Sequence, residues 1–181
     1  MNLAVNNGVM SIENALERHF EPETVDDIEF DNGAATVKLK ATQRSFISNA
    51  PEVLVFNLLR FGFDESSNTS FKINRRCKFP LVLDMKSYIG IGGTDPILYE
   101  LHGILVHAGT AESGHYFSLI KEREANGQWH RYDDEQVTPW NHELNMDAEC
   151  FGAESAESGN GTNAVLLFYD KKVVAEFFIL L

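Results

Sequence analysis

The chain has 181 residues, of which 44% are hydrophobic, and a formal net charge of -12. This length suits one domain or one large lobe with a sizeable core. The acidic charge argues against non-specific binding to nucleic acid and against anchoring on an anionic membrane. We therefore expect neither nucleic acid nor membrane as a partner, while a basic protein partner is compatible with the charge.

The sequence contains only two cysteines, Cys77 and Cys150, and they form no CxxC pair. We therefore expect no structural zinc site of the thiolate type and no other cofactor. Two cysteines make no disulfide framework, which favours a reduced intracellular setting, in the cytoplasm, the nucleus or both. Residues 1–20 lack the pattern of a signal peptide, and no apolar run approaches the length of a membrane span.

The first part of the chain contains one helical pattern and two strand patterns. Residues 11–20 predict a helix that begins after Ser11 as N-cap. Residues 21–33 are acidic and end in Asn-Gly, which favours a solvated loop and a turn. Residues 34–42 alternate between apolar and polar side chains and predict a half-buried strand. Residues 51–61 form a near-continuous apolar run, which predicts a strand buried on both faces.

The remaining segments also favour strands. Residues 64–70 read as a polar loop, residues 71–78 as a charged strand, and residues 90–96 as a glycine-rich loop. Residues 141–163 are polar and acidic and predict a long mobile loop. Residues 164–169 predict a last buried strand. The expected class is therefore α+β, mostly antiparallel sheet with a minor helical part.

The chain is organised around residues 101–120, with the sequence LHGILVHAGTAESGHYFSLI. Two apolar runs flank a glycine-rich turn, which predicts a β-hairpin. His107 leaves the first strand, and His115 opens the second. Gly114, just before His115, allows another chain to pass close to the backbone. A hairpin built only for packing has no need of this arrangement.

A base and an acid are predicted to meet beside this hairpin. If residues 115–120 and 128–132 are neighbouring antiparallel strands, His115 meets Asp133 or Asp134 at one edge of the sheet. An imidazole held by a carboxylate is the general-base half of a nucleophilic triad. The alternative is a surface histidine beside an acidic loop. His107, taken by itself, is a structural residue.

Neither cysteine is a convincing nucleophile. Cys77 lies among Arg75, Arg76 and Lys78, which would lower its pKa if it were exposed, but the sequence favours a half-buried cysteine within a strand. Cys150 lies in the acidic loop, where carboxylates would raise its pKa. The sequence also contains no GxSxG elbow, no phosphate-binding loop and no HxxE-type metal-ligand spacing.

Several of these stretches together resemble the ubiquitin-specific proteases, which are papain-like cysteine deubiquitinases with a fingers-palm-thumb fold. The matching stretches are residues 51–61, 72–74 with Phe79-Pro80, 101–120, 129–137 and 163–169. They occur in the order of the family. The resemblance is to members whose fingers lack the zinc-binding cysteine pairs.

The resemblance implies a fold and a set of site residues. The fold would be the palm and part of the fingers, with the thumb missing. His115 would be the general base, Asp133 would orient it, and Asp134 would assist. The residues expected to border the cleft for the ubiquitin tail are His107, Gly109, Ser113, Gly114 and Tyr116.

The resemblance also divides the chain and shows one departure. Residues 1–33 would be a partial fingers or linker segment, residues 34–172 the palm and fingers lobe, and residues 173–181 a C-terminal extension. The family's cysteine box, with the nucleophile and an oxyanion-stabilising Asn, does not occur in these residues. The chain therefore matches the half of the enzyme that carries the base.

The expected activity is thiol-dependent hydrolysis after the C-terminal Gly of ubiquitin. This chain would supply the His/Asp half of the triad and would be inactive by itself. The expected partners are ubiquitin or ubiquitinated proteins and a missing thumb segment. One alternative is a catalytically inactive ubiquitin-binding or scaffold module. Another is an unrelated all-β binding domain, in which His115 and Asp133 would lie far apart.

Overall fold

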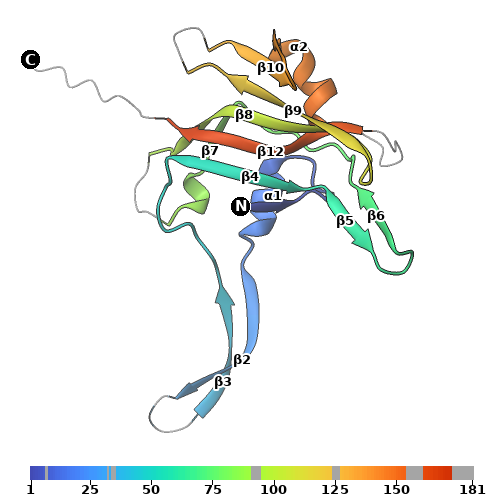
Figure 1. Cartoon of the computed structure of the whole chain (residues 1–181). Helices are drawn as coiled ribbons and strands as arrows, with labels where there is room; N and C mark the ends of the chain where they lie inside the picture. The colour runs from blue at the N-terminus through green and yellow to red at the C-terminus, as the bar shows by residue number, and fades with distance from the viewer. Residues whose placement is uncertain are drawn as a thin grey trace, which may run out of the picture.

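A computed structural model describes residues 1–6, 8–31, 33, 36–90, 95–123, 127–153 and 161–172 (Figure 1). Several sequence expectations concern residues outside these ranges. They are the C-terminal extension 173–181, most of the glycine-rich loop 90–96, and part of the predicted loop 141–163. The division of the chain into three parts stays a prediction.

The described residues form one eight-stranded main sheet with the strand order β1-β4-β12-β8-β9-β10-β11, and β7 pairs with β8. Its strands are β1 Asn2–Ala4, β4 Val53–Leu59, β7 Val82–Asp84, β8 Leu98–Gly109, β9 Gly114–Lys121, β10 Trp129–Asp133, β11 Gln136–Pro139 and β12 Gly161–Lys171. The β1–β4 pair is parallel, and the other pairs are antiparallel. The expected α+β class with a mostly antiparallel sheet is confirmed.

The predicted central hairpin is β8–β9. Its register runs from Gly103 opposite Ile120 to Gly109 opposite Gly114. Gly109 has a φ of 125°, and a Cβ atom there would lie 2.5 Å from the carbonyl oxygen of Ser113. Glycine is therefore required where the chain reverses.

The predicted first helix is α1, Ile12–His19, with the side chain of Ser11 as N-cap accepting from the amide of Asn14. Ile12, Ala15 and Leu16 are buried and belong to the core under the sheet. Burying a side chain such as Leu16 contributes about 1.5–3 kcal/mol. In Figure 1, α1 lies close to β1 and β4. A short 3-10 helix, η1 Lys86–Tyr88, follows β7.

The expectation that residues 51–61 form a strand buried on both faces is wrong. In β4, Leu54, Phe56 and Leu58 are buried, whereas Val53 and Val55 on the other face are 50% and 37% exposed. The core packs against one face of this strand. A near-continuous apolar run cannot by itself reveal which of the two faces is covered.

The acidic residues 21–33 were expected to form a loop, but most of them form β2, Glu23–Asp31. This strand pairs with β3, Thr36–Gln43, which is exposed rather than half-buried as expected. Ile28 lies opposite Leu39, and Phe30 lies opposite Val37. These cross-strand apolar pairs stabilise a ribbon that extends away from the body (Figure 1). The strand was not predicted because the many carboxylates of β2 interrupt the apolar pattern typical of a strand.

A second short hairpin consists of β5, Phe61–Asp64, and β6, Thr69–Lys72. The expected polar loop is only its turn, in which Asp64 accepts from the hydroxyls of Ser66 and Ser67. The charged strand expected over residues 71–78 ends at Lys72, and only isolated bridges follow it.

The mobile loop expected over residues 141–163 is also corrected, because its first part is helical. Asn141 caps α2, His142–Met146, by accepting from two backbone amides, and a π-type turn η2, Asp147–Phe151, continues it. Met146 and Cys150 are buried, four residues apart, and anchor this segment. Residues 154–160 lie outside the described part. None of the helices in the described residues is long and apolar enough to cross a membrane.

Candidate active site

Two antiparallel strands bring a base and an acid together. β9 pairs with β10 from Trp129 opposite Lys121 to Tyr132 opposite Ser118. The start of β9 and the end of β10 therefore lie at the same edge of the sheet. His115 Nε2 lies 2.5 Å from Asp133 Oδ1, which is a short hydrogen bond. The juxtaposition predicted from the sequence is present, and it contradicts the alternative in which the two residues lie far apart.

The pair shifts the pKa of both partners. The hydrogen bond to Asp133, together with the charges of Asp133 and Asp134, raises the pKa of His115, while desolvation and the Arg131 cation oppose this rise. The hydrogen bonds from His115 and Arg131 lower the pKa of Asp133. Each group thus favours the charge of its partner.

The geometry leaves the other ring nitrogen available. A neutral imidazole that donates from Nε2 to a carboxylate carries its lone pair on Nδ1. The His115 side chain is 47% exposed, so a group approaching from outside the chain can reach the ring. The arrangement can therefore accept a proton at Nδ1 and stabilise the resulting imidazolium.

Asp134 lies in the tight turn between β10 and β11 and has a φ of 51°. Ligand atoms of His115, Asp133 and Asp134 lie within 4.8 Å of one another, so this group is compact enough to hold a cation. However, Arg131 already donates to Asp133 Oδ2 at 2.8 Å, and its positive charge opposes a second cation there. The group is therefore better suited to hold a proton than a metal ion.

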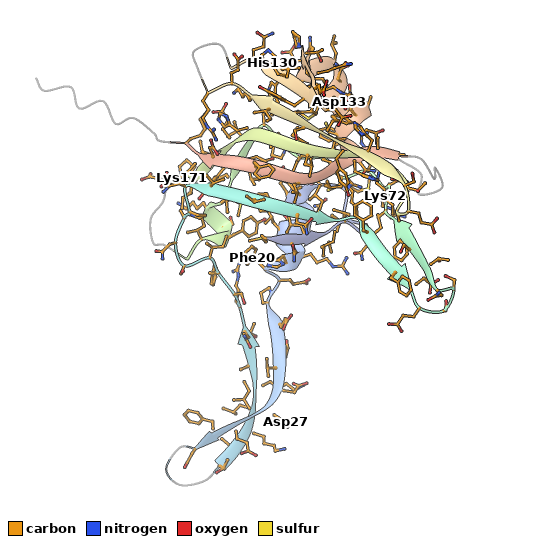
Figure 2. All side chains as sticks on the ribbon, in the orientation of Figure 1. Phe20, Asp27, Lys72, His130, Asp133 and Lys171 are labelled. Atoms are coloured by element: carbon orange, nitrogen blue, oxygen red, sulfur yellow. The ribbon has the colours of Figure 1, made fainter. Side chains whose placement is uncertain are left out.

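A groove of about 400 Å³ lies between the β5–β6 hairpin and the turn that joins β8 to β9. Of the residues expected to border the cleft, it is lined by His107, Ser113, Gly114 and Tyr116. Gly109 is not part of this lining. Figure 2 labels Lys72 of β6 at the base of the β5–β6 hairpin, on the right of the view, and Asp133 of β10 higher up, near the top of the sheet.

His107 forms part of the groove but offers no exposed imidazole. Its ring is buried, 4.6 Å from the ring of Tyr116 and 5.1 Å from that of Phe61. Burial, assisted by the charge of Lys72, lowers the pKa of His107. A Cβ atom on Gly114 would lie only 2.1 Å from His107 Nε2. Because Gly114 has no side chain, the His107 ring can pack directly against its backbone.

Lys72 fixes this wall of the groove. Its ammonium group donates to the carbonyl oxygens of His107, Gly109 and Gly161 at 3.0, 3.3 and 2.6 Å. Burial lowers the pKa of Lys72 to about 8. The residue thereby connects the β5–β6 hairpin to β8 and β12. Gly109 contributes to the site through its carbonyl.

Comparison with known proteins defines the family of this chain. The family model for ubiquitin carboxyl-terminal hydrolase matches residues 6–169. The chain belongs to the ubiquitin carboxyl-terminal hydrolase family. The resemblance to ubiquitin-specific proteases found in the sequence is thereby confirmed.

Curated relatives include ubiquitin carboxyl-terminal hydrolase 24 of Mus musculus, which is 32% identical in an alignment of 143 residues that covers 62% of this chain and 6% of the relative. The probable ubiquitin carboxyl-terminal hydrolase FAF of Drosophila melanogaster is 34% identical in an alignment of 139 residues that covers 65% of this chain and 5% of the relative. The human ubiquitin carboxyl-terminal hydrolase 17-like protein 15 is 32% identical over 164 residues, 90% of this chain and 26% of the relative. The chain therefore spans a small part of these proteins.

Solved structures also match the fold of this chain. The SAGA Ubp8/Sgf11/Sus1/Sgf73 DUB module bound to ubiquitin aldehyde contains a chain that matches with a TM-score of 0.75 and 26% identity, covering 96% of this chain and 36% of the other. The same module with a substituted Ubp8, bound to monoubiquitin, matches with a TM-score of 0.74 and 26% identity, covering 96% of this chain and 35% of the other. The palm-type fold of this family member is thus shown.

Both thiols of this ubiquitin carboxyl-terminal hydrolase family member lie in the core. Cys77 is 0% exposed, so it is more deeply buried than expected, and burial raises its pKa to about 11. Burial and the neighbouring Glu149 carboxylate raise the pKa of Cys150 well above its usual range. Burial therefore disfavours the reactive thiolate form of both cysteines in the folded chain.

Two side chains at this site of the chain were not predicted from the sequence. Arg131 donates to Asp133, and Glu149 accepts from Arg131. Arg131 could have been found, because residues two apart on a strand share one face. Glu149 carried no such signal, since residues 141–163 read as a mobile loop.

Proposed function

We propose that this chain supplies the base and the orienting acid for thiol-dependent hydrolysis after the C-terminal Gly of ubiquitin. His115 is the general base, Asp133 orients it, and Asp134 adds negative charge. The observation that carries this proposal is the 2.5 Å hydrogen bond between His115 Nε2 and Asp133 Oδ1, next to Gly114 and Tyr116, the chain neighbours of His115 that line the groove. The nucleophilic thiol comes from outside these residues.

The proposed reaction follows from the free Nδ1 of His115. This nitrogen takes the proton of the thiol, and the thiolate attacks the carbonyl carbon of the ubiquitin C-terminal Gly. The imidazolium then gives its proton to the departing amine as the C–N bond breaks, which leaves a thioester. In the second half, His115 deprotonates a water molecule that attacks the thioester, and the thiol leaves with that proton. Asp133 stabilises the imidazolium in both halves.

The groove is the proposed site for the ubiquitin tail. A Gly-Gly end fits a narrow channel, since its residues have no side chains to clash with the walls. Tyr116 is 51% exposed and lines the groove, so it offers an aromatic surface to the bound backbone. The matching solved modules are bound to monoubiquitin and to ubiquitin aldehyde, which supports ubiquitin as the partner here.

A second candidate function is a ubiquitin-binding or scaffold module without activity. The burial of both thiols favours it for the isolated chain. For either function we propose an intracellular location, cytoplasmic or nuclear, because both cysteines are free thiols.

Binding can be tested with ¹⁵N-labelled chain titrated with ubiquitin and with ubiquitin that lacks its last two glycines. We expect the amide resonances of residues 109–116 to change their chemical shifts only with intact ubiquitin. Replacing Tyr116→Ala should weaken binding by about tenfold, the effect typical of an interface aromatic. Tyr132→Ala is the matched control, because Tyr132 is 40% exposed but is not part of the groove lining. Equal binding of both ubiquitins would contradict the tail site.

Hydrolysis can be tested with a fluorogenic ubiquitin amide. We expect no release from the isolated chain and release when a family segment that carries the cysteine box is added. His115→Ala should abolish this release. Binding without release, even after that addition, would favour the inactive module. Release from the isolated chain that disappears in His115→Ala would contradict the proposal of an external thiol.

A further inference from the structure

Asp133 uses both oxygens of its carboxylate. Oδ1 accepts from His115, and Oδ2 accepts from Arg131 Nη2 at 2.8 Å and from Nε at 3.1 Å. A carboxylate held at one oxygen can rotate about its Cβ–Cγ bond, because this torsion has broad minima. A carboxylate held at both oxygens cannot rotate without losing a charge-assisted hydrogen bond. The Arg131 fork therefore fixes which oxygen faces the imidazole.

Arg131 is itself held from two other sides. Its guanidinium carbon lies 3.7 Å from the ring centroid of Phe117. Its Nη1 donates to Glu149 Oε2 at 3.0 Å, and Glu149 Oε1 accepts from Trp140 Nε1 at 3.3 Å. Trp140 is buried, so this end of the network is anchored in the core. A continuous set of polar contacts thus runs from the His115 ring to the helical segment after β11.

The strand pattern explains why these groups meet. Arg131 and Asp133 are two residues apart on β10, and His115 and Phe117 are two residues apart on β9, so each pair shares one face of its strand. The register places Arg131 opposite Leu119, which is two residues from Phe117 on β9, so the two faces lie on the same side of the sheet. The guanidinium can therefore stack on Phe117 and reach Asp133 in the same conformation.

We propose that Arg131 is a positioning residue for the His115–Asp133 pair, and that Glu149 and Trp140 anchor it from the helical segment. This inference rests on the proposed role of His115 as base. Arg131 gives orientation rather than basicity, since its charge opposes the rise in the pKa of His115 caused by Asp133 and Asp134. The segment α2–η2 thereby takes part in setting the geometry of the base.

If the role of Arg131 were purely structural, it would only attach the helical segment to the sheet. Arg76 offers a matched control for this attachment. Arg76 donates to both carboxylate oxygens of Asp147 at 2.5 Å and lies 5.4 Å from the ring centroid of Phe151. This ion pair and this stacking contact hold the same segment η2. Arg76→Lys therefore tests attachment of the segment, whereas Arg131→Lys tests attachment and positioning together.

The experiment uses the full chain with ¹⁵N-labelled histidine, without ubiquitin. The Nε2–H resonance of His115 is assigned by its loss in His115→Gln. Its solvent exchange rate and the pKa of His115 are then measured in the wild type and in Arg131→Lys, Glu149→Gln and Arg76→Lys. Arg131→Lys keeps the positive charge, so a change reports the loss of the planar fork. Urea unfolding confirms that each variant is folded.

We expect Arg131→Lys to speed the exchange of the Nε2–H proton about tenfold, as for the loss of a hydrogen bond to a charged group, and to lower the pKa of His115. Glu149→Gln should change both quantities less and in the same direction. Arg76→Lys should leave both unchanged. The inference would be overturned if Arg131→Lys left the exchange rate and the pKa of His115 unchanged. It would also be overturned if Arg76→Lys changed both quantities as much as Arg131→Lys does.

These outcomes are independent of the proposed function. The readout needs neither ubiquitin nor turnover, so a chain that fails to bind ubiquitin still shows whether Arg131 orients the pair. Conversely, a chain that binds ubiquitin and completes hydrolysis, while Arg131→Lys leaves the exchange rate unchanged, would refute the role of Arg131 alone.

Discussion

Gly114 and the His107 ring face each other so closely that no side chain fits between them. The two residues lie on the paired strands β8 and β9, and a Cβ atom on Gly114 would meet Nε2 of His107 at 2.1 Å and the carbonyl oxygen of Ala108 at 2.7 Å. The groove at the mouth of the central hairpin therefore depends on a glycine at this position. The same glycine keeps His107 packed between two aromatic rings.

The first prediction concerns this contact. Gly114→Ala should reduce the free energy of unfolding by about 1–3 kcal/mol, because the new methyl group overpacks a buried ring and a backbone carbonyl. Urea denaturation measures this change. Gly103→Ala is the control, since a Cβ atom there lies 3.3 Å from Phe168 side-chain atoms, which can shift slightly. Equal stability of the two variants would show that His107 moves aside easily.

The second prediction concerns the dependence of stability on pH. The pKa of His115 is raised from 6.5 in the folded chain, so its stabilising effect is fully present below pH 6.5 and is lost as the pH rises through the folded pKa. The pKa of Asp133 is lowered from 3.8, so its effect is present above pH 3.8 and is lost as the pH falls through the folded pKa. The pair therefore stabilises the fold between these two limits.

The measurement is the difference in the free energy of unfolding between the wild type and His115→Gln across this pH range. We expect the difference to decrease as the pH rises past the folded pKa of His115. In an Asp133→Asn background the same comparison should depend much less on pH, because the carboxylate partner is gone. A difference that stays constant with pH in the wild type would contradict the coupling of the two groups.

The third prediction concerns the two thiols. Cys77 and Cys150 are both buried, and burial raises the pKa of Cys77 to about 11. A thiol reagent at pH 8 should therefore label neither cysteine in the folded chain within minutes, and should label both in urea. The number of thiols that react in each state is read from the absorbance of the reagent. Rapid labelling of one cysteine under native conditions would reveal a thiol available for chemistry.

The fourth prediction concerns Arg60, which is fully buried. Its guanidinium donates to the carbonyl oxygens of Ala164, Ile73 and Arg75 at 2.7, 2.9 and 2.8 Å, and to that of Phe151 at 3.3 Å. Burial lowers the pKa of Arg60 to about 10. This cation joins β12 to the segment after β6 and to η2.

Arg60→Met should lower the free energy of unfolding by about 3 kcal/mol or more, because several buried carbonyl groups would lose their partner. Thermal and urea unfolding measure the loss. Arg123→Met is the control: the Arg123 side chain is 73% exposed and pairs with Asp170, so its loss should cost about 1 kcal/mol or less. A mild effect at Arg60 would mean that water replaces the guanidinium.

The sequence predicted the elements that depend on local order. The helix after Ser11, the hairpin around Gly109 and the last strand follow from a cap, a turn and apolar periodicity, all of which act within a few residues. The meeting of His115 and Asp133 also follows, because pairing of adjacent strands places the start of one beside the end of the next.

Only the tertiary structure decided which surfaces are covered. It left one face of β4 exposed, buried His107 beneath Gly114, placed both thiols in the core, and brought Glu149 to Arg131. Burial depends on segments that are distant in sequence, so one apolar strand can be covered on one face or on two with the same residue pattern. The local sequence pattern therefore predicted that His115 and Asp133 meet, whereas long-range packing determined how both side chains are held.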